Sequence, residues 1–405
     1  MSVLRKGLTT LAIVFGTAAP AWAQDPPHVH PAASPSSGGW RVMQDGVVYA
    51  LFNNQGGPRG DREFVLPNWW MGMTATDRGR HRIGFNGMLS LDALTVGKSG
   101  YSELFQAGEI LEGEPLVDRQ HPHDFLMQLA ASWRVSMGGA RALTIAGGPA
   151  GEPTLGPVAF MHRQSAAGLP FAPLGHHTFD ATHVSFGVVT ASVDLGRVTI
   201  EGSVFNGREP DDDRWDLDLG RLDSVAGRVW FRPAEHWELQ ASTGRLRDAE
   251  SQDAGDTQRT TASVGWIRNR QDGFDAWTTG WGMNAGHGEQ RHGTFGEFTI
   301  ERGPHFAAAR VDVQQLELDK WLPAASVDEH EHSGTAVAFT VGGGRRVLAR
   351  RGFEGVLAFQ LTVNRSPEAL RSTHGAAPVA GQIYFRLRLP GMRMWQMRMS
   401  SGMGH

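Results

Sequence analysis

Apolar and polar residues alternate with a period of two along most of the chain. The pattern is clear in residues 353–364, where Leu357 and Phe359 alternate with Gln360 and Thr362. Successive side chains of a strand point to opposite faces, so the pattern predicts strands that are apolar on one face and polar or small on the other. A wall between lipid and an aqueous lumen has this character.

About sixteen segments carry the pattern, and many exceed the ~9–11 residues that a strand needs to cross a bilayer. We predict strands at residues 40–52, 64–76, 80–93, 124–137, 140–150, 178–194, 197–207, 221–232, 236–247, 258–271, 274–288, 291–302, 305–320, 335–350, 353–364 and 379–390.

The gaps between these segments are alternately short and long. Long gaps run over 53–63, 94–123, 151–177, 208–220, 248–257, 321–334 and 365–378, and Glu289-Gln290 is a short gap where a long one is due. Transmembrane barrels have tight periplasmic turns and longer external loops. We therefore predict an all-β, antiparallel up-and-down transmembrane barrel of about 16 strands (14–18), with both ends on the short-turn side. A soluble β-sandwich is the alternative.

The last predicted strand contains the alternating run Tyr384-Phe385-Arg386-Leu387-Arg388-Leu389. This run resembles the terminal assembly signal of Gram-negative outer-membrane β-barrel proteins, a class that includes the porins. The usual terminal aromatic residue is missing, because the chain continues to His405. The resemblance implies contact with outer-membrane lipid, lipopolysaccharide and the outer-membrane assembly machinery.

The start of the chain has the pattern of an export signal. Arg5 and Lys6 precede an apolar run, and Ala21-Trp22-Ala23 is typical of a cleavage site. We expect a signal peptide at 1–23, cleaved near Ala23, a flexible periplasmic segment at 24–39, the barrel at 40–390, and a Met-rich tail at 391–405. The expected location is the outer membrane of a Gram-negative bacterium.

Composition narrows the picture further. The formal net charge of −4 indicates no nucleic-acid partner. Cysteine is absent, so an exported chain of this kind is held together without disulfides or thiolate metal sites. The expected partners in the lumen are small solutes or metal ions.

Histidine and aspartate gather in the two longest gaps and the residues that follow them. We expect these loops to fold inward and narrow a pore, with a constriction or substrate site formed by Asp118, Arg119, His121, His123, Asp124, His162, Arg163, His176, His177, Asp180 and His183. A simpler interpretation is that these side chains bond to one another and fix the shape of the loops. Within the set, His121, His123, His176 and His177 are candidate ligands for Cu or Zn.

Other segments carry weaker metal signals. Soft thioethers and imidazoles near the termini are candidate copper ligands, namely His28, His30, Met394, Met397, Met399 and His405. Two acidic runs are either Ca²⁺ sites or solvated loop faces, namely Asp211-Asp212-Asp213 with Asp216 and Asp218, and Asp328-Glu329-His330-Glu331-His332.

Three functions are compatible with these patterns. The leading hypothesis is a passive channel for small solutes, with a secondary role in copper or other transition-metal handling. An inward positive lining, expected from Arg228, Arg232, Arg268, Arg270, Arg310, Arg386 and Arg388, favours anionic solutes. A lipid-modifying enzyme is the alternative, with Ser165 near His162 or Ser185 near His183, although no nucleophile motif frames either serine. The third is a structural barrel without transport.

Overall fold

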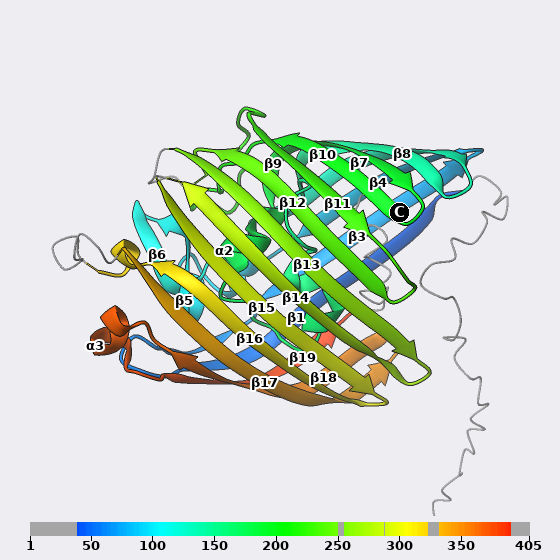
Figure 1. Cartoon of the computed structure of the whole chain (residues 1–405). Helices are drawn as coiled ribbons and strands as arrows, with labels where there is room; N and C mark the ends of the chain where they lie inside the picture. The colour runs from blue at the N-terminus through cyan, green and yellow to red at the C-terminus, as the bar shows by residue number, and fades with distance from the viewer. Residues whose placement is uncertain (1–38, 250–254, 287, 323–331, 390–405) are drawn as a thin grey trace, which may run out of the picture.

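The structure is a computed structural model that describes residues 39–249, 255–286, 288–322 and 332–389. Over these residues the chain forms a closed antiparallel β-barrel, which confirms the predicted fold (Figure 1). The expected signal peptide at 1–23, nearly all of the 24–39 segment and the 391–405 tail lie outside the described residues. In the described part, none of the helices is long and apolar enough to span a membrane.

The wall closes because β1 (Arg41–Gln55) pairs with strands from both ends of the sheet, β19 (Val379–Arg388) and β3 (Asn68–Arg78). The short β2 (Arg62–Val65) also pairs with β1 and shares one wall position with β3, so the described strands make a 16-strand barrel. The remaining wall strands are β4 (His81–Leu89), β7 (Leu126–Gly138), β8 (Arg141–Gly151), β9 (Ser185–Leu195), β10 (Val198–Phe205), β11 (Ser224–Phe231), β12 (Trp237–Arg247), β13 (Asp256–Arg270), β14 (Gly273–Gly286), β15 (Glu289–Arg302), β16 (His305–Glu317), β17 (Ser333–Arg350) and β18 (Phe353–Arg365).

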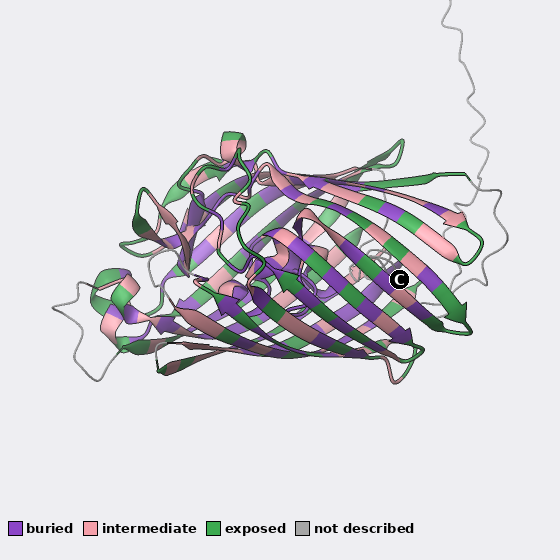
Figure 2. Ribbon diagram, turned by 90° about the horizontal axis from the view of Figure 1, so that it is seen from above, coloured by how far each residue is buried: buried purple, intermediate pink, exposed green. Residues whose placement is uncertain are grey.

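Burial follows the sequence alternation along the strands. In β18, Leu357, Phe359 and Leu361 are exposed on the outside, whereas Ala358 and Gln360 are buried inside. Figure 2 shows the same alternation of exposed and buried residues along neighbouring strands. The outer surface is therefore apolar, as lipid requires, and the inner surface carries small and polar side chains.

The two ends of the barrel wall lie on the side that the sequence predicts. The first residues of β1 and the last residues of β19 lie at the end of the barrel that holds the short turns, on the right of Figure 1. The short gap predicted at Glu289-Gln290 is wrong in position, because both residues belong to β15 and Gly286 pairs directly with Glu289 at the long-loop end.

Several predicted elements are wrong in detail. The strand predicted at 178–194 begins only at Ser185, because α2 (His176–Phe179) and η3 (Ala181–His183) precede it, and the strand predicted at 80–93 ends at Leu89, before α1 (Asp92–Thr95). The gap at 94–123 contains an unpredicted hairpin of β5 (Tyr101–Leu111) and β6 (Glu114–Gln120), whose register shifts twice and so conceals the period of two. Short helices also form at η1 (Phe160–His162), η2 (Gln164–Ala166), η4 (Leu318–Lys320), η6 (Glu368–Leu370) and α3 (Arg371–His374).

The predicted orientation of two arginines is also wrong. Arg268 and Arg270 are exposed and share the outward alternation of β13, whereas Arg259, Thr261 and Ser263 on the opposite face are buried. Arg270 pairs with Asp275 on β14 near the short turn between the two strands. These two arginines therefore belong to the rim of the barrel and not to its lining.

Candidate functional site

Two long loops fold into the barrel, and the later one in the sequence, residues 152–184, is called the second inner loop. It crosses the inside of the barrel between β8 and β9, where α2 is visible through the wall in Figure 1. Wall side chains bind its backbone on several sides. Arg228 on β11 donates to the carbonyl of Gly156 (3.0 Å), and Tyr384 on β19 donates to the carbonyl of Gly168 (2.9 Å). Arg310 on β16 donates to the carbonyls of Phe171 and Ala172. These bonds fix the loop across the lumen.

A buried arginine joins this loop to the opposite wall. Arg163 Nε donates to Glu297 Oε1 on β15 (2.7 Å), and Arg163 Nη1 donates to Asp180 Oδ2 (2.7 Å). All three side chains are almost completely shielded from solvent. Burial opposes ionisation of Asp180, but Arg163 and His176 together hold its pKa well below the usual range. Asp180 is therefore a fixed anion in the centre of the loop.

The first inner loop, residues 90–125, lies between β4 and β7 and touches the second. Gln106 on its hairpin donates to the carbonyl of Pro173 (2.9 Å), and Asn53 on β1 donates to the carbonyl of Ser102 (2.7 Å). Glu109 forms an ion pair with Arg214 from the loop between β10 and β11. The mouth of the barrel is thus filled by three interacting loops.

Five histidines from the two inner loops form one cluster. The ring centroids of His176 and His183 are 5.3 Å apart, those of His123 and His183 are 5.7 Å apart, and those of His121 and His177 are 5.6 Å apart. His121 also stacks on His176 at 6.4 Å. The structure therefore brings together residues that lie in separate loops of the sequence.

Each imidazole of the cluster has an oxygen next to its Nδ1 atom. Asp92 Oδ2 is 2.8 Å from Nδ1 of His123, and Asp180 Oδ1 is 2.7 Å from Nδ1 of His176. The carbonyl oxygen of Asp180 lies 2.8 Å from Nδ1 of His183. The other two rings lie next to carboxylates: Glu109 Oε1 is 3.1 Å from Nδ1 of His121, and Glu209 Oε1 is 3.2 Å from Nδ1 of His177.

Burial favours the neutral form of three of these rings, because it lowers the pKa of His121, His176 and His183. Burial lowers the pKa of His176, and Asp180 opposes this only in part. Burial together with His176 and His123 lowers the pKa of His183 well below its usual value. A neutral imidazole has one N–H, and the neighbouring oxygen assigns that N–H to Nδ1, so Nε2 carries a lone pair.

Three of these Nε2 atoms are buried without a hydrogen-bond partner, those of His123, His176 and His183. A buried acceptor that is left unsatisfied costs about 1–3 kcal/mol and calls for a physical explanation. The simpler interpretation, that the loop side chains only bond to one another, accounts for the Nδ1 atoms but not for these Nε2 atoms.

Two pockets adjoin the cluster. The loop-side pocket has about 520 Å³ of empty space, part of it open to solvent, and is lined by Glu109, His183 and Glu209 among others. The turn-side pocket has about 640 Å³, part of it also open, and is lined by Tyr49, Trp69 and Arg388 among others. His123 lines both pockets, so the two pockets meet at this side chain.

Some predicted site residues lie elsewhere. Asp118 holds the hairpin against His374 and Trp321, and Arg119 binds Glu63 at the first wall strands. The ring of His162 packs on Trp69 at 5.1 Å, away from the cluster. The candidate ligands Met394, Met397, Met399, His405, His28 and His30 lie outside the described residues.

The serines proposed for an enzyme have other partners. Ser165 Oγ donates to Glu297 Oε1 (2.7 Å), and Ser185 Oγ donates to the carbonyl of Thr182 (3.1 Å). Each hydroxyl is thus engaged with an oxygen and not with the histidine nearest to it in sequence. This arrangement gives no support to a nucleophile activated by histidine.

Sequence reasoning missed the residues that orient the cluster. Asp92 and Glu109 come from other parts of the first inner loop, Glu209 and Arg214 come from the loop between β10 and β11, and Arg214 lies 3.7 Å from the predicted residue Asp124. Their polar character was visible, but their sequence separation from the histidines gave no signal of proximity. Only the closure of the barrel brings them together.

The inward arginines are largely neutralised. Arg228 pairs with Glu201 (2.7 Å), Arg310 pairs with Asp312 (2.9 Å), and Arg388 pairs with Asp45. Each guanidinium has a carboxylate beside it. These pairs weaken the expectation of anionic solutes, because the positive charge of the three arginines is balanced.

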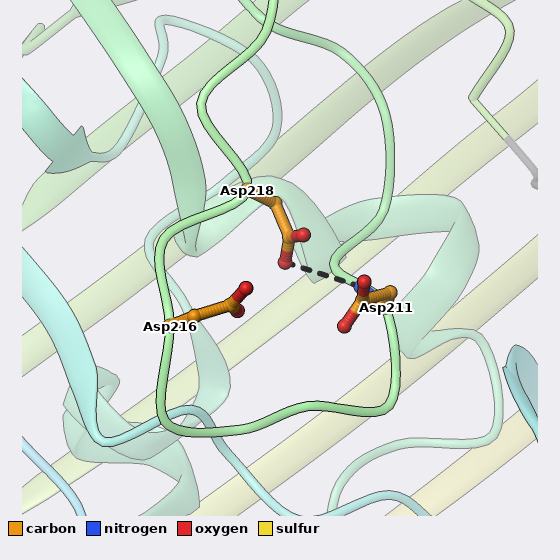
Figure 3. Close-up of side chains that lie close together, drawn as sticks. All are labelled: Asp211, Asp216 and Asp218. Carbon is orange, nitrogen blue, oxygen red and sulfur yellow. Dashed lines mark hydrogen bonds between the residues drawn. The ribbon is translucent and has the colours of Figure 1, made fainter.

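The first acidic run forms a cluster in the loop between β10 and β11. Figure 3 shows the carboxylates of Asp211, Asp216 and Asp218 turned toward one another, with ligand oxygens within 4.8 Å. Asp211 and Asp216 are exposed, and Asp218 accepts a hydrogen bond from the backbone N–H of Asp211 (3.2 Å). A solvated loop face has the same features. Residues 328–331 of the second acidic run lie outside the described residues.

Comparisons with known proteins bear on the fold. The sequence matches no protein-family model and no curated protein. Among solved structures, OprB of Pseudomonas putida is similar with a TM-score of 0.54 and 8% identity, over 87% of this chain and 94% of that chain. An anion-selective porin from Comamonas acidovorans is similar with a TM-score of 0.49 and 12% identity, over 87% and 100%. At these identities the likeness concerns the fold alone: the chain has the barrel architecture of outer-membrane porins.

Proposed function

We propose that the protein is a passive channel for small solutes in the outer membrane of a Gram-negative bacterium, narrowed by its two inner loops. The observation that carries the proposal is a closed wall with an apolar exterior, whose interior contains two pockets separated at His123. Barrels of 16–18 strands leave an aqueous passage unless a loop or domain fills it. Here the fixed second inner loop reduces the passage without a separate plug domain among the described residues.

The arrangement supports a narrow channel over a wide one. Phe160, Met161 and Phe171 of the second inner loop are buried inside the barrel, and Arg163 fixes the loop to Glu297. The hairpin of β5 and β6 occupies the mouth above it. Solutes therefore pass between side chains of the two loops and the wall, and their size is the first property that the channel selects.

Permeation into liposomes tests the proposal. Purified full-length protein is reconstituted, and the entry of neutral polyols and sugars of increasing size is followed by swelling. We expect entry of the smallest solutes and exclusion of the larger ones, and protein-free liposomes give the baseline. Swelling at the baseline rate for every solute would contradict the proposal.

A further inference from the structure

We propose that the Nε2 atoms of His123, His176 and His183 bind a divalent transition-metal ion that prefers nitrogen ligands, for which Zn²⁺ and Cu²⁺ are the probes. The inference does not depend on transport, because the site would exist in an open or a closed barrel. The proposed site differs from the four candidate ligands that the sequence suggested, because it consists of three defined nitrogen atoms.

The first argument is the unused lone pair on each donor. The three Nε2 atoms are shielded from solvent and have no hydrogen-bond partner, and the side chain of His176 is 0% exposed. Buried polar atoms are normally satisfied, so three unsatisfied acceptors in one cluster indicate a missing cationic partner. Imidazole nitrogen is a favoured ligand of Zn²⁺ and Cu²⁺.

The second argument is the support behind each donor. Metal-binding histidines usually donate their other ring N–H to a carboxylate or a carbonyl, which fixes the ring and its tautomer. Asp92 holds His123, and the carboxylate and carbonyl of Asp180 hold His176 and His183. Asp92 is itself fixed, because its Oδ1 accepts the backbone N–H of Asn68 (2.8 Å) on the wall.

The third argument is spacing. His183 lies between the other two rings, with centroid distances of 5.7 Å to His123 and 5.3 Å to His176. Two imidazoles bound to one tetrahedral ion with metal–nitrogen bonds of ~2.0–2.1 Å have ring centres roughly 5 Å apart. At least one pair of Nε2 atoms is more than 4.8 Å apart, so the rings must turn toward a common centre on binding.

The charges around the site suit a cation. Asp92 and Asp180 stand directly behind the donors, and Glu109 and Asp124 lie in the same cluster of loops. Arg163 and Arg214 balance part of this charge by direct ion pairs. His121 and His177 stand beside the three donors, where Glu109 and Glu209 hold them.

Titration of the full-length protein tests the site. Protein in detergent is stripped of metal with a chelator, dialysed, and titrated with Zn²⁺ by calorimetry, and Cu²⁺ is added to a second sample for electron paramagnetic resonance. We expect one Zn²⁺ per chain and a Cu²⁺ spectrum with nitrogen hyperfine structure. Absence of stoichiometric Zn²⁺ binding would overturn the proposal.

Variants locate the ion. His176→Gln and His183→Gln should weaken Zn²⁺ binding by roughly 100-fold or more, and Asp92→Asn should weaken it by about 10–100-fold through the orientation of His123. His305→Gln, at an exposed position on β16, is the matched control and should bind as the wild type does. Heat-modifiable migration in gels shows that each variant keeps its barrel.

The histidine variants also separate this site from the termini, which carry further histidines and methionines. Zn²⁺ binding that is unchanged in His176→Gln and His183→Gln would place the ion elsewhere and refute the assignment. Asp92→Asn is nearly isosteric and lies outside the donor set, so it keeps the test decisive if the histidine variants fold poorly.

Discussion

At the scale of single residues, Arg163 is the buried residue of the second inner loop that forms an ion pair with the wall. It binds Glu297 on β15 and Asp180 on the loop, and it donates to the carbonyl of Val158 (2.8 Å). Removing one member of a buried ion pair costs about 3–5 kcal/mol, because the remaining charge is left buried without a partner. Two carboxylates would be left in this position.

We therefore predict that Arg163→Gln loosens the second inner loop while the barrel remains closed. A broad-specificity protease added to folded protein should cut within residues 152–184 in this variant and leave the wild type intact. Arg141→Gln, at an exposed position beside a short turn, is the matched control. Identical digestion of all three proteins would show that Arg163 does not hold the loop.

At the scale of elements, Asp118 gathers several of the contacts that hold the hairpin of β5 and β6. Asp118, on β6, accepts hydrogen bonds from Trp321 Nε1 (3.0 Å) and the backbone N–H of Phe105 (3.0 Å), and it pairs with His374 and Arg59. Its own backbone has a positive φ of 57°, an uncommon conformation for a residue other than glycine. One carboxylate thus joins the hairpin to three other loops.

Asp118→Ala should release the hairpin from its neighbours. The expected result is faster hydrogen–deuterium exchange in residues 101–120, because the backbone bonds of a short two-stranded hairpin are weak without tertiary support. Exchange in the wall strands should stay unchanged. Asp272→Ala in a short turn is the control, and equal exchange rates in both variants would refute the role of Asp118.

Prediction from sequence succeeded for the wall and failed for the contents of the lumen, for a physical reason. One face of each wall strand is apolar toward the outside, so Leu357 and Phe359 alternate with smaller or polar residues. This alternation can be recognised in the amino-acid sequence. Inside the barrel, burial has no fixed period, and β5, β6 and α2 are held by side-chain bonds to distant strands. Segment 178–183 continued the apparent alternation of β9, although Asp180 and His183 belong to the histidine cluster.

The candidate site was predicted as a list of residues and not as an arrangement. His121, His123, His176, His177 and His183 do meet, because both inner loops fold into the same end of the lumen. Of their supporting carboxylates only Asp180 was in the predicted set, because Asp92 and Glu109 lie far from the histidines within the first inner loop and Glu209 lies in the loop between β10 and β11. Asp118, Arg119 and His162 share the composition of the cluster but bind other partners.

At the scale of the whole molecule, the barrel supplies a closed wall, and in the proposed channel the loops decide which solutes pass. Wall strands pair continuously around the closed sheet, so their shape is insensitive to changes in the loops. The inner loops are attached to the rest of the barrel through side chains such as those of Arg163 and Asp118. Substituting these residues should change the loops without changing the wall. Any selectivity of the passage therefore belongs to the loops.

Single-channel conductance in planar bilayers tests the central claim most directly. The wild type is compared with a variant in which residues 102–119 are replaced by a short Gly/Ser linker that keeps His121 and His123. We predict small conductance steps for the wild type and larger steps for the variant, because removal of the hairpin widens the mouth of the barrel. Equal steps from both proteins, or no steps above the detergent control from either, would contradict a channel narrowed by its inner loops.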